Sequence, residues 1–373
     1  MSQPGNLMNH TSPRTFFPEA QLQQARRQAD PVADAAVESL FAQHSFGELN
    51  GWIAALVKND QPLPDQFPDA LRAYFSQTVP LPGWANGRKM QQGAAFFARH
   101  ARPALSILGC YSLPFSYAAA DGAQVLWLSQ RIRQDTRRRL AETAQFLLDV
   151  TDKNAFAPAG KGIRSIQKVR LIHAAIRYHV NRSGQWQDAW GVPVNQEDMV
   201  GTHLSLSYIV LDGLSKLGFY YSQEEAEAYL HLWNVIGAML GIDEEMLPKS
   251  MKAAYWLEKR IRERHFRQSE AGIGLTKALL DCMTEAAPVA IAKDFLPAYI
   301  RFLTGDKVAD LLNVPAGARA SVALGSIRVG NSIGGLFNQF RQSPADGIAA
   351  LLLNELEGNG GRTGFGVPEK LRD

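Results

Sequence analysis

Apolar residues recur along most of this chain at spacings of three and four, which is the period of an amphipathic helix. Capping residues divide the pattern into segments: Asp30-Pro31 and the Ser222–Glu225 capping box each begin a helix, and Gly218 ends one. We find no clear alternating strand and no hairpin turn between β-branched runs. The chain is therefore predicted to be all-α.

No long Pro/Gly/Ser linker separates the predicted helices, so we expect one large domain. That domain spans residues 19–355, between a loose polar arm at residues 1–18 and a mobile Gly-rich tail at residues 356–373. The predicted helices cover residues 31–41, 47–58, 64–78, 85–119 with an interruption at Pro103, 123–151, 161–183, 196–217, 222–236, 250–267, 271–284, 290–303 and 317–340.

The helix predicted at residues 161–183 has the most informative pattern. Ile166, Val169, His173, Ile176 and Val180 share one stripe, so a single imidazole interrupts an apolar face. A histidine in this position is usually a hydrogen-bonded core residue. Histidine is also a common metal ligand, and the pattern alone leaves both alternatives open.

Two arginines flank this histidine. Arg170 stands three residues before His173 and Arg177 four after it, each about 40 to 60 degrees round the helix at ~100 degrees per residue. A coordinating base between two cations on an apolar surface fits a flat apolar ligand with a metal centre and two carboxylates, which describes haem. Alternatively, the arginine stems lie along apolar surface with their heads in water.

The cost of burying those guanidiniums also bears on the choice. Without anions, each would cost several kcal/mol on an apolar face. The acids nearest in the sequence are Asp188, Glu197 and Asp198. An external dicarboxylate is therefore an attractive partner for the arginines.

A second mixed face precedes this helix. Arg139, Glu142, Thr143 and Phe146 fall on one side of the helix predicted at residues 123–151. Opposite a haem they would form a polar distal pocket, in which Arg139 and Thr143 hydrogen-bond to oxygen and Glu142 moves protons. Spacing alone favours a simpler interpretation, an Arg–Glu surface pair worth a few tenths of a kcal/mol.

Composition narrows the remaining possibilities. The 373 residues are 46% hydrophobic and 20% charged, enough for a large core, and the net charge of +3 argues against a nucleic-acid-binding protein. The two cysteines, Cys110 and Cys282, are expected to be buried thiols. The chain has no C-x-x-C-H motif, so any haem would be held noncovalently.

Targeting signals are not apparent. No apolar run reaches the ~18 residues of a membrane span, and the first residues lack the basic and apolar regions of a signal peptide. We therefore expect a cytoplasmic protein. The basic segment 249–267, with Tyr255 and Trp256, is a minor candidate for contact with a membrane surface.

The segment Val169–Arg177, VRLIHAAIR, resembles the haem-ligand motif of the latex clearing proteins, which are rubber oxygenases, and of the wider MpaB-type oxygenase family. The upstream segment Arg139–Thr143, RLAET, resembles a second motif of that family. Residues 30–34, 190–198 and 296–315 also fit, so the resemblance covers most of the chain from about residue 20 to 345.

The resemblance implies a globin-like helical core, one haem b, and a dioxygenase-like enzyme that uses O2 to oxidise or cleave an unsaturated hydrophobic substrate, an isoprenoid or a lipid. It assigns roles to residues as follows: His173 as the proximal iron ligand; Arg170, Arg177 and Arg301 beside the haem; Arg139 and Thr143 as catalytic residues on the distal side. We expect Glu142, on the same helical face, to be catalytic as well, as a residue that moves protons. We expect His173→Ala to abolish haem retention.

The chain also departs from that family. Rubber-cleaving members carry a lysine where this chain has Glu142, and they carry an export signal. A small hydrophobic substrate therefore fits this chain better than a rubber polymer. Two alternatives stay open: a non-catalytic haem or gas-binding protein, and a helical scaffold with no cofactor.

Overall fold

The computed structural model describes residues 16–129, 136–286 and 289–316. Over these residues the chain is helical, and its β-structure is limited to one isolated bridge between Ala119 and Phe266. The all-α prediction is confirmed for this part of the chain. The helix predicted at 317–340, the tail at 356–373 and most of the arm at 1–18 lie outside the described residues.

The elements, in chain order, are α1 (Glu19–Ala25), α2 (Pro31–Phe41), α3 (Phe46–Ala55), α4 (Asp69–Gln77), α5 (Gly87–Arg99), α6 (Ala101–Ile107), the π-helix η2 (Leu108–Ser112), α7 (Leu113–Tyr117), α8 (Ala120–Leu128), α10 (Thr136–Thr151), α11 (Gly162–Arg182), the 3₁₀ turn η3 (Asp188–Trp190), α12 (Gln196–Leu206), α13 (Tyr208–Lys216), α14 (Gln223–Met239), α15 (Met251–His265), α16 (Glu270–Ala286), α17 (Val289–Thr304) and α18 (Asp306–Leu311).

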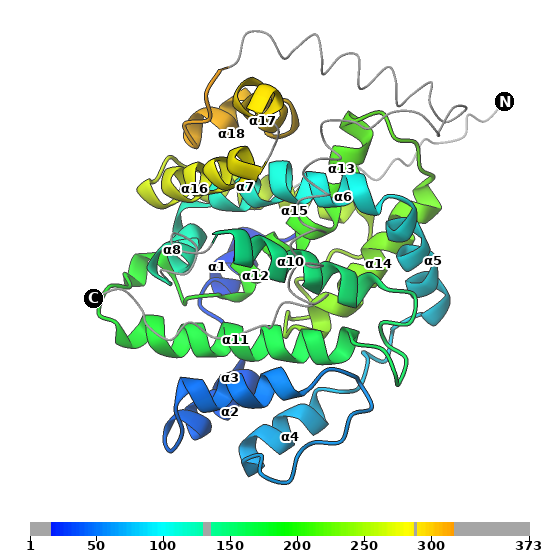
Figure 1. Ribbon diagram of the computed structural model, residues 1–373, viewed down its shortest axis with the longest axis vertical. Helices are drawn as coiled ribbons and strands as arrows, with labels where there is room; N and C mark the ends of the chain where they lie inside the picture. The colour runs from blue at the N-terminus through cyan, green and yellow to red at the C-terminus, as the bar shows by residue number, and fades with distance from the viewer. Residues whose placement is uncertain (1–15, 130–135, 287–288, 317–373) are drawn as a thin grey trace, which may run out of the picture.

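Helix α11 crosses the middle of the molecule (Figure 1) and packs against α2 on one side and α10 on the other. Helices α2 to α4 lie below α11 in this view, and α16 to α18 lie at the opposite end. Helix α14 runs along α5 at one side. The helix with the apolar stripe and the single histidine is therefore central to the fold.

The close packing of α5 on α14 depends on a glycine. A Cβ atom at Gly93 would lie 2.7 Å from the Ala228 carbonyl oxygen and 3.0 Å from the Leu232 Cβ. Such a distance is far below van der Waals contact, so only glycine fits between the two backbones. The main hydrophobic core on either side includes Tyr229 and Trp233, both fully buried.

Two predicted helices are interrupted in ways that the sequence pattern does not reveal. The segment 85–119 forms four elements, and the π-helix η2 inserts an extra residue into the turn between α6 and α7. The segment 196–217 breaks at Ser207, whose hydroxyl donates to the His203 carbonyl at 2.8 Å. This local bond competes with the helical backbone ladder and separates α12 from α13.

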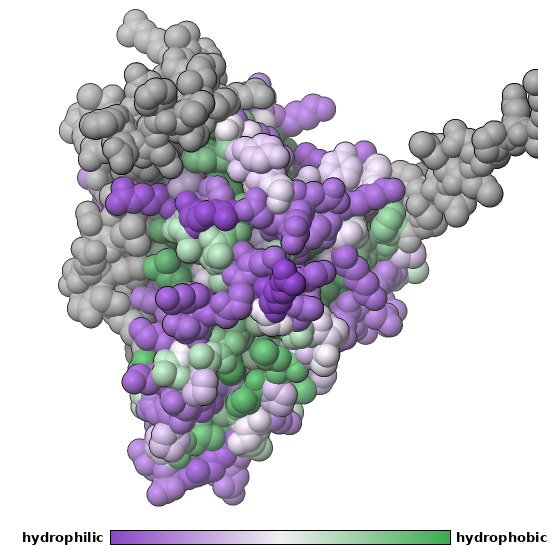
Figure 2. Space-filling model, turned by 90° about the vertical axis from the view of Figure 1, so that its right-hand side faces the viewer, coloured by the Kyte–Doolittle hydropathy of each residue, from purple (hydrophilic) through white to green (hydrophobic). Residues whose placement is uncertain are grey.

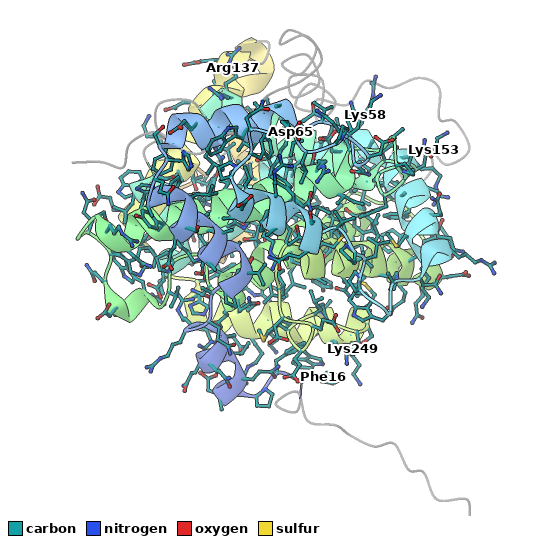
Figure 3. All side chains as sticks on the ribbon, turned by 90° about the horizontal axis from the view of Figure 1, so that it is seen from below. Phe16, Lys58, Asp65, Arg137, Lys153 and Lys249 are labelled. Atoms are coloured by element: carbon teal, nitrogen blue, oxygen red, sulfur yellow. The ribbon has the colours of Figure 1, made fainter. Side chains whose placement is uncertain are left out.

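The surface is mixed. On the face shown in Figure 2, hydrophilic residues form a broad band across the middle, and apolar residues gather below it. Lys58, Lys153 and Lys249 lie at the rim of the molecule (Figure 3), so the positive charge is dispersed. Among the described helices, none combines the length and apolar character that a membrane crossing needs. Cys110 and Cys282 are both buried and are not joined in a disulfide, as predicted.

Helix α15 contains most of the basic segment considered for a membrane surface. Its residues Ala254, Leu257 and Ile261 are buried in a second hydrophobic cluster, to which α1 and α12 also contribute. Tyr255 is exposed, at 41% of its surface. Most apolar residues of α15 thus stabilise the fold, and membrane contact stays a prediction.

Candidate functional site

The apolar face of α11 lies between the core and a cavity. Ile166 and Val180 are fully buried in the core, whereas Val169, His173 and Ile176 line the cavity. Arg182 lies in the last turn, where a cation interacts favourably with the helix dipole. The predicted stripe is confirmed, and its single histidine faces an internal space.

The cavity has a volume of about 320 Å³ and lies between α7, α8, α10, α11, α12, α14 and α15. Such a volume is within the range of ~300–1,000 Å³ typical of ligand pockets. Its apolar wall includes Leu140, Phe146, Val169, Ile172 and Ile176. The space therefore favours a largely apolar ligand.

His173 meets this cavity as a neutral imidazole. Burial, together with the nearby charges of Arg177 and Arg139, lowers its pKa to about 3, against a weaker opposing effect of Asp30. The Nδ1 atom is buried and has no hydrogen-bond partner within the described structure, and the same holds for both ring nitrogens of His203, which also lines the cavity. Of the two histidines, His173 is the one that lies on the apolar stripe of α11.

The two arginines of α11 have partners that the sequence analysis did not anticipate. Arg170 binds Asp30 through Nε at 2.5 Å and Nη2 at 2.8 Å, and Arg177 donates from Nε to Asp34 at 2.7 Å. Both acids lie on or beside α2, some 140 residues away in sequence. The two arginines are therefore paired with these acids of the α2 region and not with Asp188, Glu197 or Asp198.

Arg170 is fully engaged and does not line the cavity. Its Nη1 donates to the Met239 carbonyl at 3.2 Å, which completes a cage around the guanidinium. Gly241, with a φ of +90°, borders this ion pair, and a Cβ there would lie 2.4 Å from Asp30 Oδ2. The structure therefore gives Arg170 a structural role between α2, α11 and α14, and we do not place it at a cofactor.

Arg177 differs from Arg170 in one respect. Its side chain is only 3% exposed, and beyond Asp34 it donates from Nη1 to the Val194 carbonyl at 3.1 Å. Its Nη2 is buried with no acceptor. An unsatisfied buried guanidinium nitrogen is costly, so this atom is suited to an anionic partner that the chain itself does not supply.

Helix α10 brings its predicted face to the cavity. Arg139, Glu142 and Thr143 all line it, beside Phe146. Glu142 accepts from Arg139 Nη1 at 3.2 Å and from Arg138 Nε at 3.1 Å. The Arg–Glu pair therefore exists, but its carboxylate is not on the surface, because the Glu142 side chain is only 4% exposed. Thr143 donates to the Arg139 carbonyl at 2.9 Å.

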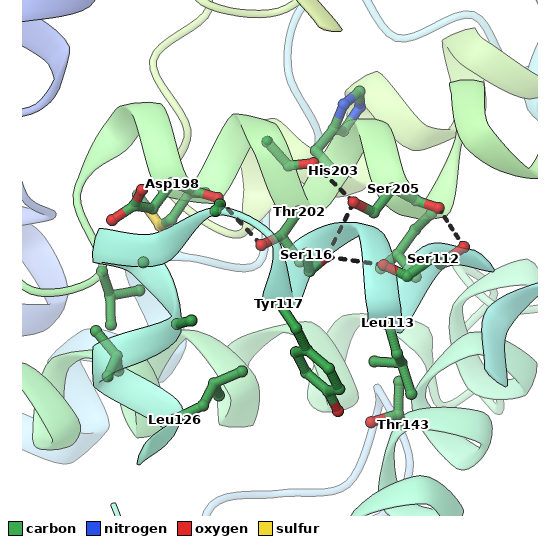
Figure 4. Close-up of a pocket in the computed structure, with 18 of the residues that line it drawn as sticks. Ser112, Leu113, Ser116, Tyr117, Leu126, Thr143, Asp198, Thr202, His203 and Ser205 are labelled. Carbon is green, nitrogen blue, oxygen red and sulfur yellow. Dashed lines mark hydrogen bonds between the residues drawn. The ribbon is translucent and has the colours of Figure 1, made fainter. Parts of the chain in front are cut away.

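A third wall of the cavity, which the sequence pattern does not predict, is formed by the end of η2, α7 and α12. Figure 4 shows Ser112, Ser116, Ser205 and Thr202 in a row along this wall. Ser112 and Ser116 both line the cavity and are four residues apart, so their spacing on one helical face was an available signal. His203 also borders the cavity, and burial lowers its pKa to about 4.

An ion cluster closes the end of this wall. Glu197 is fully buried, and it accepts from Arg264 Nε at 2.7 Å and lies 2.9 Å from His265 Nε2. Burial opposes the charge on His265, but hydrogen bonds with Asp121 and Glu197 outweigh it and raise the pKa. Burial likewise opposes the charge on Asp121, yet hydrogen bonds from His265 and Arg267 lower its pKa to about 2. Asp121 is thus held ionised by cations.

Residues 98–329 match the model of the catalytic-domain family described as ER-bound oxygenase mpaB/B'/rubber oxygenase. That match spans well over half of the chain, including both α10 and α11. The chain belongs to this family. It is therefore an enzyme of the oxygenase class.

Two relatives agree with the family assignment. The rubber oxygenase of Streptomyces sp. (strain K30) is 28% identical over 290 residues, which is 77% of this chain and 70% of that protein. The solved structure of latex clearing protein LCP in the closed state has a TM-score of 0.78 and 22% identity, with 92% of this chain and 95% of that chain covered. The resemblance and the helical fold predicted from the sequence are confirmed.

In this oxygenase, Arg301 lies away from the cavity wall. It sits near the end of α17, where its guanidinium binds Asp306 and Asp310 and donates to the Val314 carbonyl at 2.8 Å. These bonds hold α18 and the following residues against α17. The structure does not bring Arg301 to His173, so we leave it out of the proposed cofactor site.

Proposed function

We propose that this oxygenase depends on haem b and uses O2 to oxidise or cleave an unsaturated hydrophobic substrate, an isoprenoid or a lipid. His173 would be the proximal iron ligand. The observation that carries the proposal is a neutral imidazole on the apolar stripe of α11, in the wall of a cavity that the Arg139–Thr143 face of α10 also lines. Neutral imidazole is the form that coordinates iron.

The other residues of the site fit the same cofactor. No group of three or more His, Cys, Asp or Glu side chains able to hold a metal occurs in the described part of the chain. One imidazole alone is a poor iron site, whereas a porphyrin supplies four further nitrogens. Arg177, like Arg170, does not line the cavity, so we do not assign its unpartnered Nη2 to the cofactor.

When bound, the haem would supply the binding and activation of O2. The protein's own residues would prepare the space around it. Arg139 places a positive charge at the cavity wall, and Glu142 orients that charge through their 3.2 Å contact. The Thr143 proton is committed to a backbone carbonyl, so its oxygen can accept a hydrogen bond. Phe146 and the apolar face of α11 exclude water.

Glu142 is fixed in place on the cavity wall. Two guanidiniums donate to its carboxylate, Arg138 at 3.1 Å and Arg139 at 3.2 Å, which sets the orientation of the group. We expect Glu142→Gln to keep the shape of the site and to lower turnover. A variant with wild-type turnover would show that Glu142 only positions Arg139.

The test uses full-length protein reconstituted with haemin. Oxygen consumption and products are measured with geranylgeraniol and squalene, and with their saturated counterparts phytanol and squalane. The proposal expects oxygenated products from an unsaturated substrate and none from its saturated counterpart. Reversible O2 binding without consumption would favour the gas-binding alternative, and a failure to take up haem would refute the proposal.

A further inference from the structure

The two sides of the cavity differ in polarity. The α11 side presents the aliphatic groups Val169, Ile172 and Ile176, and α10 adds the Arg139–Glu142 pair and Thr143. The wall formed by the end of η2, α7 and α12 presents hydroxyls (Figure 4). The hydroxyls and their backbone acceptors are Ser112 to Ser205 O at 2.6 Å, Ser116 to Ser112 O at 2.9 Å, Thr202 to Asp198 O at 3.0 Å and Ser205 to Gly201 O at 3.1 Å. Each proton is therefore used within the protein.

The oxygens of these hydroxyls keep free acceptor capacity. A hydroxyl that donates to a carbonyl still has lone pairs to offer. Ser112 and Ser205 are almost fully buried, Ser116 is half-buried, and Thr202 is exposed, so the row runs from the interior toward solvent. The Ser116 and Ser205 oxygens lie 3.0 Å apart. A ligand that meets this wall would be recognised best if it donates a hydrogen bond.

The charges at the end of the wall favour a neutral ligand. Glu197, Asp198 and His265 line the cavity there. Asp198 accepts from Arg26 Nη1 at 3.0 Å, and Glu197 is bound by Arg264 and His265, so each carboxylate already has a cation. An acidic ligand would meet two carboxylates at this wall. A cationic one would find them neutralised.

A purely hydrocarbon ligand also fits poorly. It would displace water from the Ser116 and Thr202 oxygens without replacing the hydrogen bonds, and such unsatisfied groups cost free energy. The α11 face, by contrast, presents the aliphatic side chains of Val169, Ile172 and Ile176, which need no hydrogen bonds. The cavity therefore matches a molecule with a long apolar chain and one neutral donor at its end.

We propose that the substrate is an unsaturated alcohol, whose hydroxyl binds Ser116 and Thr202 on the α7–α12 wall while its chain extends into the cavity toward Arg139 and Thr143, the side on which O2 would be used. This inference rests on the proposed function, because it names the substrate class of the same site. It places the polar group near the solvent-exposed Thr202 and the alkene in the interior.

The test compares geranylgeraniol with the same tetraene lacking its hydroxyl. Binding is measured by calorimetry, and kcat/KM by oxygen consumption of the haem-reconstituted protein. One neutral hydrogen bond predicts a preference for the alcohol of about tenfold in both quantities. Ser116→Ala is expected to remove most of this preference by weakening alcohol binding, with the hydrocarbon little affected.

Ser207→Ala is the matched control. Ser207 also donates to the carbonyl four residues earlier, at 2.8 Å, but it does not line the cavity. It should keep the preference for the alcohol. Equal binding of alcohol and hydrocarbon to the wild type, or an unchanged preference in Ser116→Ala, would overturn the inference. Tighter alcohol binding without turnover would leave the inference standing and refute the oxygenase proposal instead.

Discussion

The buried ion pair between Asp30 and Arg170 should dominate the stability of the α2–α11 contact. The side chains are 2% and 12% exposed, and two short bonds join them. Removal of one partner strands a buried charge, which typically costs about 3–5 kcal/mol. A domain is stable by only about 5–15 kcal/mol in total, so either single substitution should be severe.

Urea unfolding of the haem-free protein measures this effect. Asp30→Leu and Arg170→Met should each lower the free energy of unfolding by about 3–5 kcal/mol, and the double variant by much less than the sum, because it leaves no charge unpaired. Lys277→Met removes the exposed pair with Asp281 and should cost less than about 1 kcal/mol. Additive losses, or single losses below about 1 kcal/mol, would refute the reasoning.

Three further predictions follow from packing, titration and capping. Gly93→Ala should lower the unfolding free energy by about 1–3 kcal/mol because its Cβ meets the Ala228 carbonyl, whereas Gly51→Ala, with open space around it, should be neutral or stabilising by about 0.5–1 kcal/mol in thermal denaturation. Burial lowers the His203 pKa from 6.5 to about 4, so between these two values the unfolded chain binds more protons than the folded one. The free energy of unfolding therefore decreases as the pH is lowered through this range. His203→Leu should reduce the loss of unfolding free energy between about pH 7.5 and 5. Ser222→Ala, which removes the cap of α14, should cost about 0.5–2 kcal/mol in urea unfolding.

The sequence pattern predicts the helices well and the site in part. The stripe on α11 and the mixed face on α10 follow from local spacing, and both reach the cavity as expected. The two helices meet because each buries one apolar face, which periodicity detects. The helix start predicted at Asp30 is also confirmed, since the Asp30 side chain caps α2 by accepting from Ala33 N.

Long-range pairing is what periodicity does not reveal. The partners of Arg170 and Arg177 come from α2, and nothing in the local spacing of α11 identifies Asp30 or Asp34. The same limit applies to the hydroxyl wall, because Ser116 and Ser205 meet across two helices 89 residues apart. Arg301 illustrates the converse, since its acids lie within nine residues and satisfy it locally.

The central claim is that His173 holds the cofactor. The most direct measurement is the absorption spectrum of purified protein titrated with haemin, with and without dithionite, for the wild type, His173→Ala and His179→Ala. His179 lies on the same helix but does not line the cavity. We predict a stoichiometric, reducible haem spectrum for the wild type and for His179→Ala, and loss of that spectrum in His173→Ala. Full haem retention by His173→Ala would contradict the assignment of His173 as the iron ligand.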